Sequence, residues 1–376
     1  MRTARATAAA AVTAAIGVGA AAVVAGRLAS DAALKAPPGR PLPTEPRLTV
    51  HATEPGRITL TRDLASLHPG RYGLTGDGVH AVVGPVLDGV QHTADTVVRR
   101  LERVTHGSLR TGAKVWLTPQ VHIGDPRSAL GLDHADIDIP GELGSLPAWF
   151  LPGARDTWVI TVHGLGTTRE HPMVVMEFLH RARIPVLDLA YRQDLGAPRA
   201  PDGLRHLGET EWRDVDAAIR YAVRYGARKV ILHGWSTGAA MALHAAARSG
   251  VRDRISGLVL DSPVLDPEAT LRALAEARRA PRILLPLAVR AARGRTGAAA
   301  DGQRLRPDGE PVTVPTLLLH GPADTVAPFA ASRGFARRNA DRVNLHTVAD
   351  APHGAMWNAD PARYEETLRR FLTALV

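Results

Sequence analysis

A serine between two glycines carries the clearest chemical signal in the sequence. Residues 230–240 read VILHGWSTGAA, so an apolar run leads into a Gly-x-Ser-x-Gly motif centred on Ser236, and an alanine-rich segment follows. A serine on the sharp turn between a buried strand and a helix has an exposed hydroxyl, and small residues such as Gly234 and Gly238 let strand and helix approach each other. Ser236 is therefore predicted to be a nucleophile.

An acid and a base follow in the order that such a nucleophile requires. Asp324 and His353 each come shortly after an apolar run. In a triad of this order the imidazole takes the serine proton and the carboxylate orients the imidazole. We predict His353 as the general base and Asp324 as the acid. Asp261, at the end of another apolar run, is the alternative acid, and either aspartate would otherwise be a structural cap.

Backbone amides are predicted to stabilise the oxyanion that such a serine would generate. One donor is the amide after the nucleophile, Thr237, and the second comes from the turn after an earlier strand. Residues 158–166 read WVITVHGLG, which places Leu165 on that turn between Gly164 and Gly166. We predict the amides of Leu165 and Thr237 as the pair, and His163 as a structural residue that holds the turn.

Apolar runs that alternate with helical stretches must position these residues. The predicted strands are residues 158–162, 186–189, 230–233, 258–260, 316–319 and 344–348. The predicted helices are residues 173–181, 211–225, 239–248 and 361–375. Nearly continuous apolar strands separated by helices indicate a parallel sheet covered on both faces. The sequence thus predicts a doubly wound α/β fold, whose ligands bind beyond the carboxyl ends of the strands.

Residues 136–376 resemble the α/β-hydrolase superfamily, and specifically membrane-associated serine hydrolases of the ABHD or acyl-hydrolase kind. Residues 191–192 and 208–219, which lead to the serine motif, are also similar to prolyl-oligopeptidase-like enzymes. The resemblance implies a triad of Ser236, Asp324 and His353. It also implies Leu165 and Thr237 as the oxyanion pair. The sequence departs from the usual pattern at position 239, where alanine replaces the more common glycine.

The chain divides into five predicted parts. They are a signal anchor or signal peptide (1–27), a proline-rich linker (28–46), a β-rich accessory segment (47–130), and an α/β-hydrolase catalytic domain (131–376) with a helical lid insertion (264–311). The lid is far longer than the usual connection of about 2 to 6 residues. Its apolar stretch at 283–289 suits an acyl or otherwise apolar substrate, and a solvated helical insert is the alternative.

The N-terminus carries a segment that approaches membrane-spanning length. Arg2 and Arg5 precede an uncharged, alanine-rich run at 6–26, and about 20 helical residues cross a bilayer core. Three interpretations remain: an uncleaved signal anchor, a cleaved export signal, or a helix that never meets a membrane. We predict a membrane-anchored or secreted protein whose catalytic domain lies outside the cytoplasm.

Composition removes several classes of function. The formal charge of +9 comes from arginines spread along the chain, without a compact basic patch, so nucleic-acid binding is not expected. The chain has no cysteine, which excludes disulfides, thiolate nucleophiles and thiolate zinc sites. We expect neither a metal nor an organic cofactor, and the oligomeric state is left open.

Three functions compete on this evidence. The leading prediction is hydrolysis of a carboxylic ester or thioester, from a small-molecule or lipid substrate, through an acyl-enzyme on Ser236. A serine peptidase is the alternative, in which Glu170, Asp194 or Asp202 at the site mouth would hold a peptide terminus. The third is a membrane-tethered binding protein with a vestigial triad.

Overall fold

The computed structural model describes residues 39–277 and 307–376. The predicted signal or anchor at 1–27, most of the linker at 28–46 and the centre of the predicted lid at 264–311 lie outside the described residues and stay predictions. In the described ranges, no helix is both long enough and apolar enough to cross a membrane.

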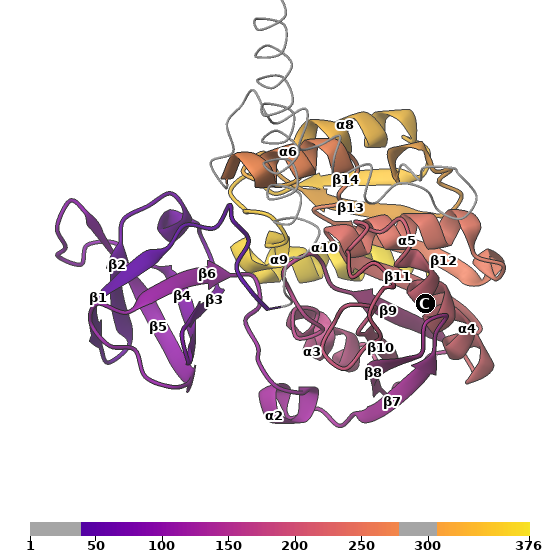
Figure 1. The fold of residues 1–376 in the computed structure, drawn as a ribbon, viewed down its shortest axis with the longest axis horizontal. Helices are drawn as coiled ribbons and strands as arrows, with labels where there is room; N and C mark the ends of the chain where they lie inside the picture. The colour runs from indigo at the N-terminus through magenta and orange to yellow at the C-terminus, as the bar shows by residue number, and fades with distance from the viewer. Residues whose placement is uncertain (1–38, 278–306) are drawn as a thin grey trace, which may run out of the picture.

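The larger part of the structure is built on one eight-stranded sheet (Figure 1). The strand order is β14-β13-β12-β11-β9-β10-β8-β7, and all neighbours from β14 to β10 run parallel. β8 pairs antiparallel with both β10 and β7. The strands are β7 Ala135–Pro140, β8 Ser145–Leu151, β9 Thr157–Val162, β10 Val186–Leu189, β11 Lys229–Trp235, β12 Ile255–Asp261, β13 Thr316–His320 and β14 Val343–Thr347.

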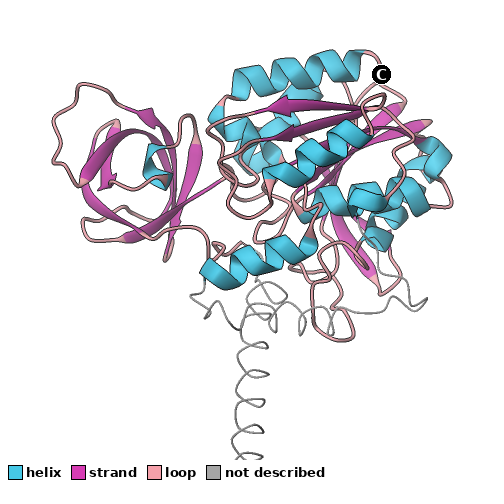
Figure 2. Cartoon of the chain, turned by 90° about the horizontal axis from the view of Figure 1, so that it is seen from above, coloured by secondary structure: helices cyan, strands magenta, loops and turns pink. Residues whose placement is uncertain are grey.

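Helices cover both faces of this sheet (Figure 2). One apolar cluster joins a sheet face to α4 Trp212–Arg224, α5 Thr237–Arg248 and α8 Phe329–Arg338. The other joins the opposite face to α3 Met173–Arg181, α9 Met356–Ala359 and α10 Pro361–Thr373. The remaining helices are short or lie at the edges: α2 Pro126–Leu130, α6 Pro267–Ala277, η1 Ala65–Leu67, η2 Arg252–Arg254 and η4 Pro307–Gly309.

The predicted α/β class is confirmed. Each of the six predicted strands of the doubly wound core overlaps an observed strand, and each of the four predicted helices overlaps an observed helix. The strands were recognisable because burial on both faces requires apolar residues at nearly every position, as in β9, whose six residues are all buried.

The N-terminal part is a closed six-stranded barrel that lies beside the sheet domain (Figure 1). Its order is β1-β2-β5-β4-β3-β6, and β1 pairs with β6 to close it. The strands are β1 Leu48–Glu54, β2 Arg57–Thr61, β3 Tyr72–Gly76, β4 Val79–Val86, β5 Thr96–His106 and β6 Lys114–Thr118. The predicted β-rich segment is thus a barrel. The sequence indicates β-like runs at 48–51, 57–60, 80–83, 96–101 and 114–117, which overlap five of its strands, and β3 is the strand that it does not indicate.

The barrel docks on the loop that carries His353. Ala355, two residues further along this loop, is fully buried in the apolar cluster of the barrel core. The buried Asn358 donates from Nδ2 to the carbonyl oxygens of Arg71 and Pro119 at 2.9 and 3.0 Å. Because buried amides need their hydrogen bonds, these contacts fix the barrel against the sheet domain.

A buried arginine organises the loop between β2 and β3. Arg99 on β5 is fully buried and its guanidinium donates to four carbonyl oxygens, those of Gly84, Ser66, His68 and Gly70, at 2.7–3.0 Å. Burial lowers the pKa of Arg99 to about 10, so the group remains charged at neutral pH. The charge is held by backbone carbonyls in place of a carboxylate, so its removal leaves several buried oxygens without a donor.

We predict that Arg99→Met destabilises the barrel by about 3 kcal/mol or more, because four carbonyl oxygens lose their donor while their burial remains. Urea unfolding of the full chain measures this as a lower midpoint. Arg100→Met is the matched control, since Arg100 is the next residue on the same strand and is exposed. Equal midpoints for the two variants would contradict the assigned role of Arg99.

Candidate active site

Ser236 lies on a strained turn between β11 and α5. Its backbone has φ 53° and ψ −115°, a conformation that is uncommon for a residue with a side chain. Its amide donates to the Asp261 carbonyl oxygen at 2.8 Å, which ties the turn to the end of β12. β11 ends just before Ser236 and α5 begins just after it, so the two elements together fix the backbone of the serine and the position of its hydroxyl.

Three glycines make the turn sterically feasible. A Cβ at Gly234 would lie 2.4 Å from the Gly238 carbonyl oxygen, and one at Gly238 would lie 2.2 Å from the Val162 carbonyl oxygen. A Cβ at Gly164 would lie 2.6 Å from the Ser236 Cβ. All three distances are shorter than atoms tolerate, so any larger residue would force β9, β11 and α5 apart.

The structure brings Ser236, His353 and Asp324 together in one hydrogen-bonded chain. His353 Nε2 lies 2.7 Å from Ser236 Oγ, and His353 Nδ1 lies 2.7 Å from Asp324 Oδ2. A carboxylate only accepts, so Nδ1 carries the proton and Nε2 accepts from the serine hydroxyl. This is the arrangement in which the imidazole can remove the serine proton.

Asp324 is held as a carboxylate by a full set of donors. The amides of Val326 and Ala327 donate to its Oδ1, both at 2.8 Å, and His320 Nε2 donates to Oδ2 at 2.9 Å. Burial opposes the charged form. The charge of His353 and the hydrogen bonds from His320 and His353 outweigh it, so the pKa of Asp324 lies well below its usual range.

Burial and the interaction with Asp324 also compete in setting the pKa of His353, and each shifts it in the direction opposite to its effect on Asp324. Burial lowers the pKa of His353, but the adjacent Asp324 carboxylate, through its charge and its hydrogen bond, raises it above the ordinary value of 6.5. A neutral His353 is thereby made a stronger base. The anionic Asp324 also stabilises the imidazolium that forms when the serine proton is taken.

Asp261, the alternative acid, bonds to Ser262 and not to His353. Its carboxylate accepts from Ser262 Oγ at 2.7 Å, and the same Oγ accepts from the Gly354 amide at 3.0 Å. Asp261 therefore supports the loop of His353 without bonding to the imidazole. Burial raises the pKa of Asp261 to about 7, which leaves it with much less charge than Asp324 at neutral pH.

The predicted oxyanion donors are next to residues that meet at the serine, since Thr237 follows Ser236 and Leu165 follows Gly164, where an added Cβ would lie 2.6 Å from the Ser236 Cβ. Thr237 is the first residue of α5, where amides have no partner inside the helix, and Leu165 follows Gly164 on the turn after β9. Within the residues that the structure describes, neither amide donates to a protein acceptor. The positive end of the α5 dipole adds to the attraction for a negative oxygen.

His163 holds the turn between β9 and α3 (the oxyanion turn, residues 163–170). Its Nε2 donates to Asp194 Oδ2 at 2.7 Å, and its ring stacks on Tyr191 at 4.5 Å. Asp194 also accepts from Arg205 Nη2 at 3.0 Å. These contacts are all buried, which agrees with the structural role that the sequence favoured for His163.

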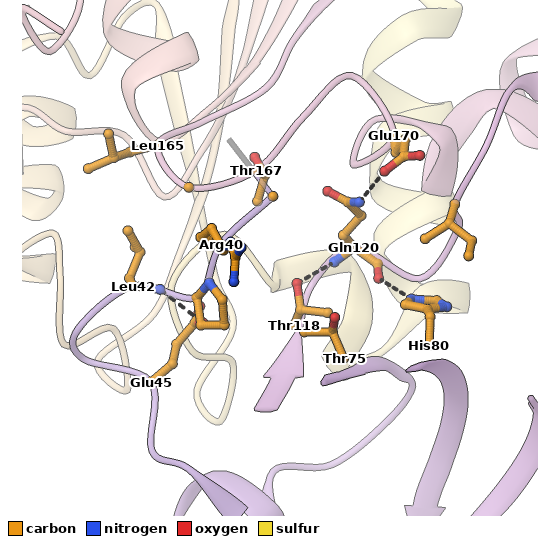
Figure 3. Close-up of a pocket in the computed structure, with 14 residues that line it drawn as sticks. Arg40, Leu42, Glu45, Thr75, His80, Thr118, Gln120, Leu165, Thr167 and Glu170 are labelled. Carbon is orange, nitrogen blue, oxygen red and sulfur yellow. Dashed lines mark hydrogen bonds between the residues drawn. The ribbon is translucent and has the colours of Figure 1, made fainter. Parts of the chain in front are cut away.

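Gln120 also supports the oxyanion turn, and the sequence gave no sign of it. It lies just after β6, and its Oε1 accepts from the Thr168 amide and hydroxyl at 3.3 and 3.2 Å. Its Nε2 donates to Glu170 at 2.5 Å, and the other Glu170 oxygen accepts from the Gly124 amide at 2.7 Å. Figure 3 shows Gln120 between Glu170, Thr118 and His80. The connection between barrel and sheet domain thus buttresses the turn that carries Leu165.

The residues that precede the barrel form a strap, residues 39–46, across this region. Leu42 is buried in one apolar cluster with Leu165, on the oxyanion turn, and Val326, two residues after Asp324. A Cβ at Gly166 would lie 2.9 Å from the Leu42 Cδ2, so the strap rests directly on the oxyanion turn. Figure 3 shows the Leu42 side chain pointing toward Leu165, with Glu45 on the strap beyond it.

The three acids considered for a peptide terminus are engaged elsewhere. Asp194 is buried and bonded to His163 and Arg205. Glu170 bonds to Gln120 and the Gly124 amide, and Asp202 bonds to His206 Nε2 at 2.7 Å. In the described parts of the chain, no group of three or more acidic or histidine side chains is arranged to hold a metal ion.

Comparison with known proteins places this site in a family. Residues 159–367, more than half of the chain, match the Alpha/beta hydrolase family, and residues 49–118 match a domain of unknown function (DUF8805). The chain therefore belongs to the alpha/beta hydrolase family. The barrel corresponds to the domain of unknown function. A comparison with curated proteins found no match.

Solved structures show the same fold. An esterase from Pyrococcus furiosus is similar with a TM-score of 0.54 and 22% identity, covering 68% of this chain and 95% of that one. An alpha-beta hydrolase from Vibrio vulnificus is similar with a TM-score of 0.50 and 18% identity, covering 64% and 81%. None of these matches supports the membrane-associated kind of hydrolase that the sequence resemblance implied.

We predict that His353 titrates above 6.5 and that Asp324→Asn lowers its pKa. The substitution removes the charge that favours the imidazolium, while burial, which opposes it, remains. Proton NMR of the histidine ring signals, assigned with a His353→Gln variant, measures this directly and needs no substrate.

Asp261→Asn is the control for this measurement. Asp261 raises the pKa of His353 through space and less strongly than Asp324, so its removal should shift the titration less. A larger shift in Asp261→Asn than in Asp324→Asn would show that the acid has been assigned to the wrong residue.

Proposed function

We propose that this protein is a serine hydrolase that cleaves carboxylic esters or thioesters through an acyl-enzyme on Ser236. The observation that carries the proposal is the chain of two 2.7 Å contacts from Ser236 through His353 to Asp324. Among the described residues, the amides of Thr237, which follows this serine, and of Leu165, which follows Gly164, donate to no protein acceptor. The Pyrococcus furiosus protein of similar fold is an esterase, which agrees with this proposal.

The geometry supports acylation in two steps. Ser236 Oγ attacks the carbonyl carbon while its proton passes to His353 Nε2, and the carbonyl oxygen becomes an oxyanion between the Leu165 and Thr237 amides. The oxyanion then collapses, the bond to the leaving oxygen or sulfur breaks, and His353 returns its proton to the leaving group. An alcohol or thiol departs and the acyl group stays on Ser236.

Deacylation repeats the same steps with water. His353 takes a proton from a water molecule, the resulting hydroxide attacks the acyl carbon, and the second tetrahedral oxyanion uses the same two amides. The bond to Ser236 Oγ breaks and His353 gives Oγ its proton. The products are a carboxylic acid and the resting enzyme.

The chain's own contacts favour an ester over a peptide substrate. A peptidase of the type considered above needs an accessible acid to hold a peptide terminus. Asp194 is buried against His163 and Arg205, Glu170 bonds to Gln120 and the Gly124 amide, and the exposed Asp202 bonds to His206.

We predict that a fluorophosphonate probe labels the wild-type protein and that Ser236→Ala abolishes both labelling and ester turnover. The elbow accepts the smaller side chain, so circular dichroism of the variant should match the wild type. Ser256→Ala, on β12 and outside the site, is the matched control and should retain both properties. Turnover that survives in Ser236→Ala would rule out the proposal, and absent labelling of folded wild type would favour a binding protein with a vestigial triad.

We predict that Asp324→Asn lowers kcat by on the order of 10³–10⁴-fold, because the imidazole loses its orienting acceptor. Asp261→Asn should cost far less, since Asp261 makes no hydrogen bond to the imidazole and acts on it only through space and through Ser262 and the loop.

The pH profile of the wild type tests the same assignment. The base works only when neutral, so kcat/KM should fall as the pH drops through the raised pKa of His353, with a midpoint above 6.5. The reverse ranking of the two asparagine variants, or an acid limb well below 6.5, would contradict these roles.

A further inference from the structure

An apolar cavity lies between the barrel and the sheet domain, and His353 forms part of its wall. Its volume is about 310 Å³. The barrel contributes Leu64, Ala65, Tyr72 and Leu117, and the sheet domain contributes Val326 and His353. A cavity of this size and lining is typical of sites that bind small organic groups.

The strap separates this cavity from a second one. Leu42 and Glu45 line both. The second cavity, of about 210 Å³ and drawn in Figure 3, contacts Leu165 on the oxyanion turn. Thr118, Gln120 and Glu170 make much of its wall polar. The apolar cavity is therefore on the imidazole side of the site and the polar one is on the oxyanion side.

The chemistry of ester cleavage determines which part of the substrate lies beside His353. The carbonyl oxygen must lie by the Leu165 and Thr237 amides, whereas the leaving oxygen must receive its proton from His353 Nε2. A group attached to the leaving oxygen therefore lies next to His353. Among the described cavities, the apolar one is lined by His353 and by no residue of the oxyanion turn.

The barrel wall of this cavity is held rigidly against the His353 loop. Arg99 binds the carbonyl oxygens of Ser66, His68 and Gly70, which fixes the loop that carries Leu64 and Ala65. His68 Nδ1 donates to the Asp350 carbonyl oxygen at 3.0 Å, across the domain boundary. A wall built in this way presents a defined shape to a ligand.

Two titratable side chains in the wall of this cavity, Glu45 and His68, are mainly neutral near neutral pH. Burial raises the pKa of Glu45 to about 8, against the hydrogen bond from the Leu42 amide and the charge of His353. Burial also lowers the pKa of His68. Both groups are therefore mainly neutral at pH 7, and Asp63 lies exposed at the edge.

We propose that this cavity binds the alcohol part of the ester, and that the barrel makes the enzyme selective for apolar, uncharged alcohols such as aromatic ones. At roughly 30 Å³ for each water-sized group, the volume suits about ten non-hydrogen atoms. The inference rests on the proposed esterase function and adds to it a substrate class and a role for the barrel.

The test compares two esters of one acid, benzyl butyrate and ethyl butyrate, on wild type and on Ala65→Phe. The ring at position 65 fills part of the cavity, so kcat/KM for the benzyl ester should fall at least about tenfold while the ethyl ester changes by less than about twofold. Leu117→Asn is a second variant, which places a polar group in the wall without filling it, and should lower the same preference.

Ala94→Phe is the matched control, because Ala94 is an exposed barrel residue that lines neither cavity. It should leave the benzyl-to-ethyl ratio unchanged. An unchanged ratio in Ala65→Phe and Leu117→Asn, with normal hydrolysis of the ethyl ester, would overturn the inference and leave the esterase function standing. A change in preference for acyl chain length, measured with ethyl esters of longer acids, would instead assign the cavity to the acyl group and also overturn it.

Fluorophosphonate labelling of each variant separates the two claims. Labelling at the wild-type rate shows that Ser236 remains active, so a changed ratio then reports on the alcohol site alone. If folded wild type neither labels nor hydrolyses either ester, the proposed function fails and the inference fails with it.

Discussion

The site depends on a close approach of three backbones at Ser236. The serine keeps φ at 53° because β11, α5 and the turn after β9 meet there without room for a Cβ at Gly164, Gly234 or Gly238. The same approach brings the turn that carries Leu165 next to Ser236, because a Cβ at Gly164 would lie 2.6 Å from the Ser236 Cβ. A single steric constraint therefore fixes both the nucleophile and the donors proposed for its oxyanion, and the sheet and its helices supply the rigidity that maintains it.

The charges near Ser236 are set by the surroundings of two aspartates. Asp324 is an anion with four hydrogen-bond donors, whereas the nearby Asp261 is largely desolvated and has a pKa of about 7. Two aspartates at the ends of adjacent strands thus have different roles, set by their surroundings. The barrel adds a further layer, since Ala355 and Asn358 join it to the loop that carries His353. In an alpha/beta hydrolase built in this way, an N-terminal domain shapes one side of the site.

The sequence predicted the elements of the sheet domain because their burial forces a readable pattern of apolar runs and helices. It also identified Ser236, Asp324 and His353, which the structure finds in contact. The choice between Asp324 and Asp261 as the acid required the structure, in which Asp324 is the one bonded to His353. Strand β3 was not recognisable, because Tyr72–Gly76 includes two glycines, which strands usually avoid. The parts played by Gln120, Leu42 and Ala65 could not be predicted, since each arises from packing between segments far apart in the chain that leave no local pattern.

The central claim, an acyl-enzyme on Ser236, is tested most directly by acid quenching during turnover of a p-nitrophenyl ester, followed by intact-mass and peptide mass spectrometry. The account predicts a mass increase of one acyl group, located on the peptide that contains Ser236 and absent from Ser236→Ala. Turnover without an adduct under conditions where deacylation limits the rate, or an adduct on another residue, would contradict it.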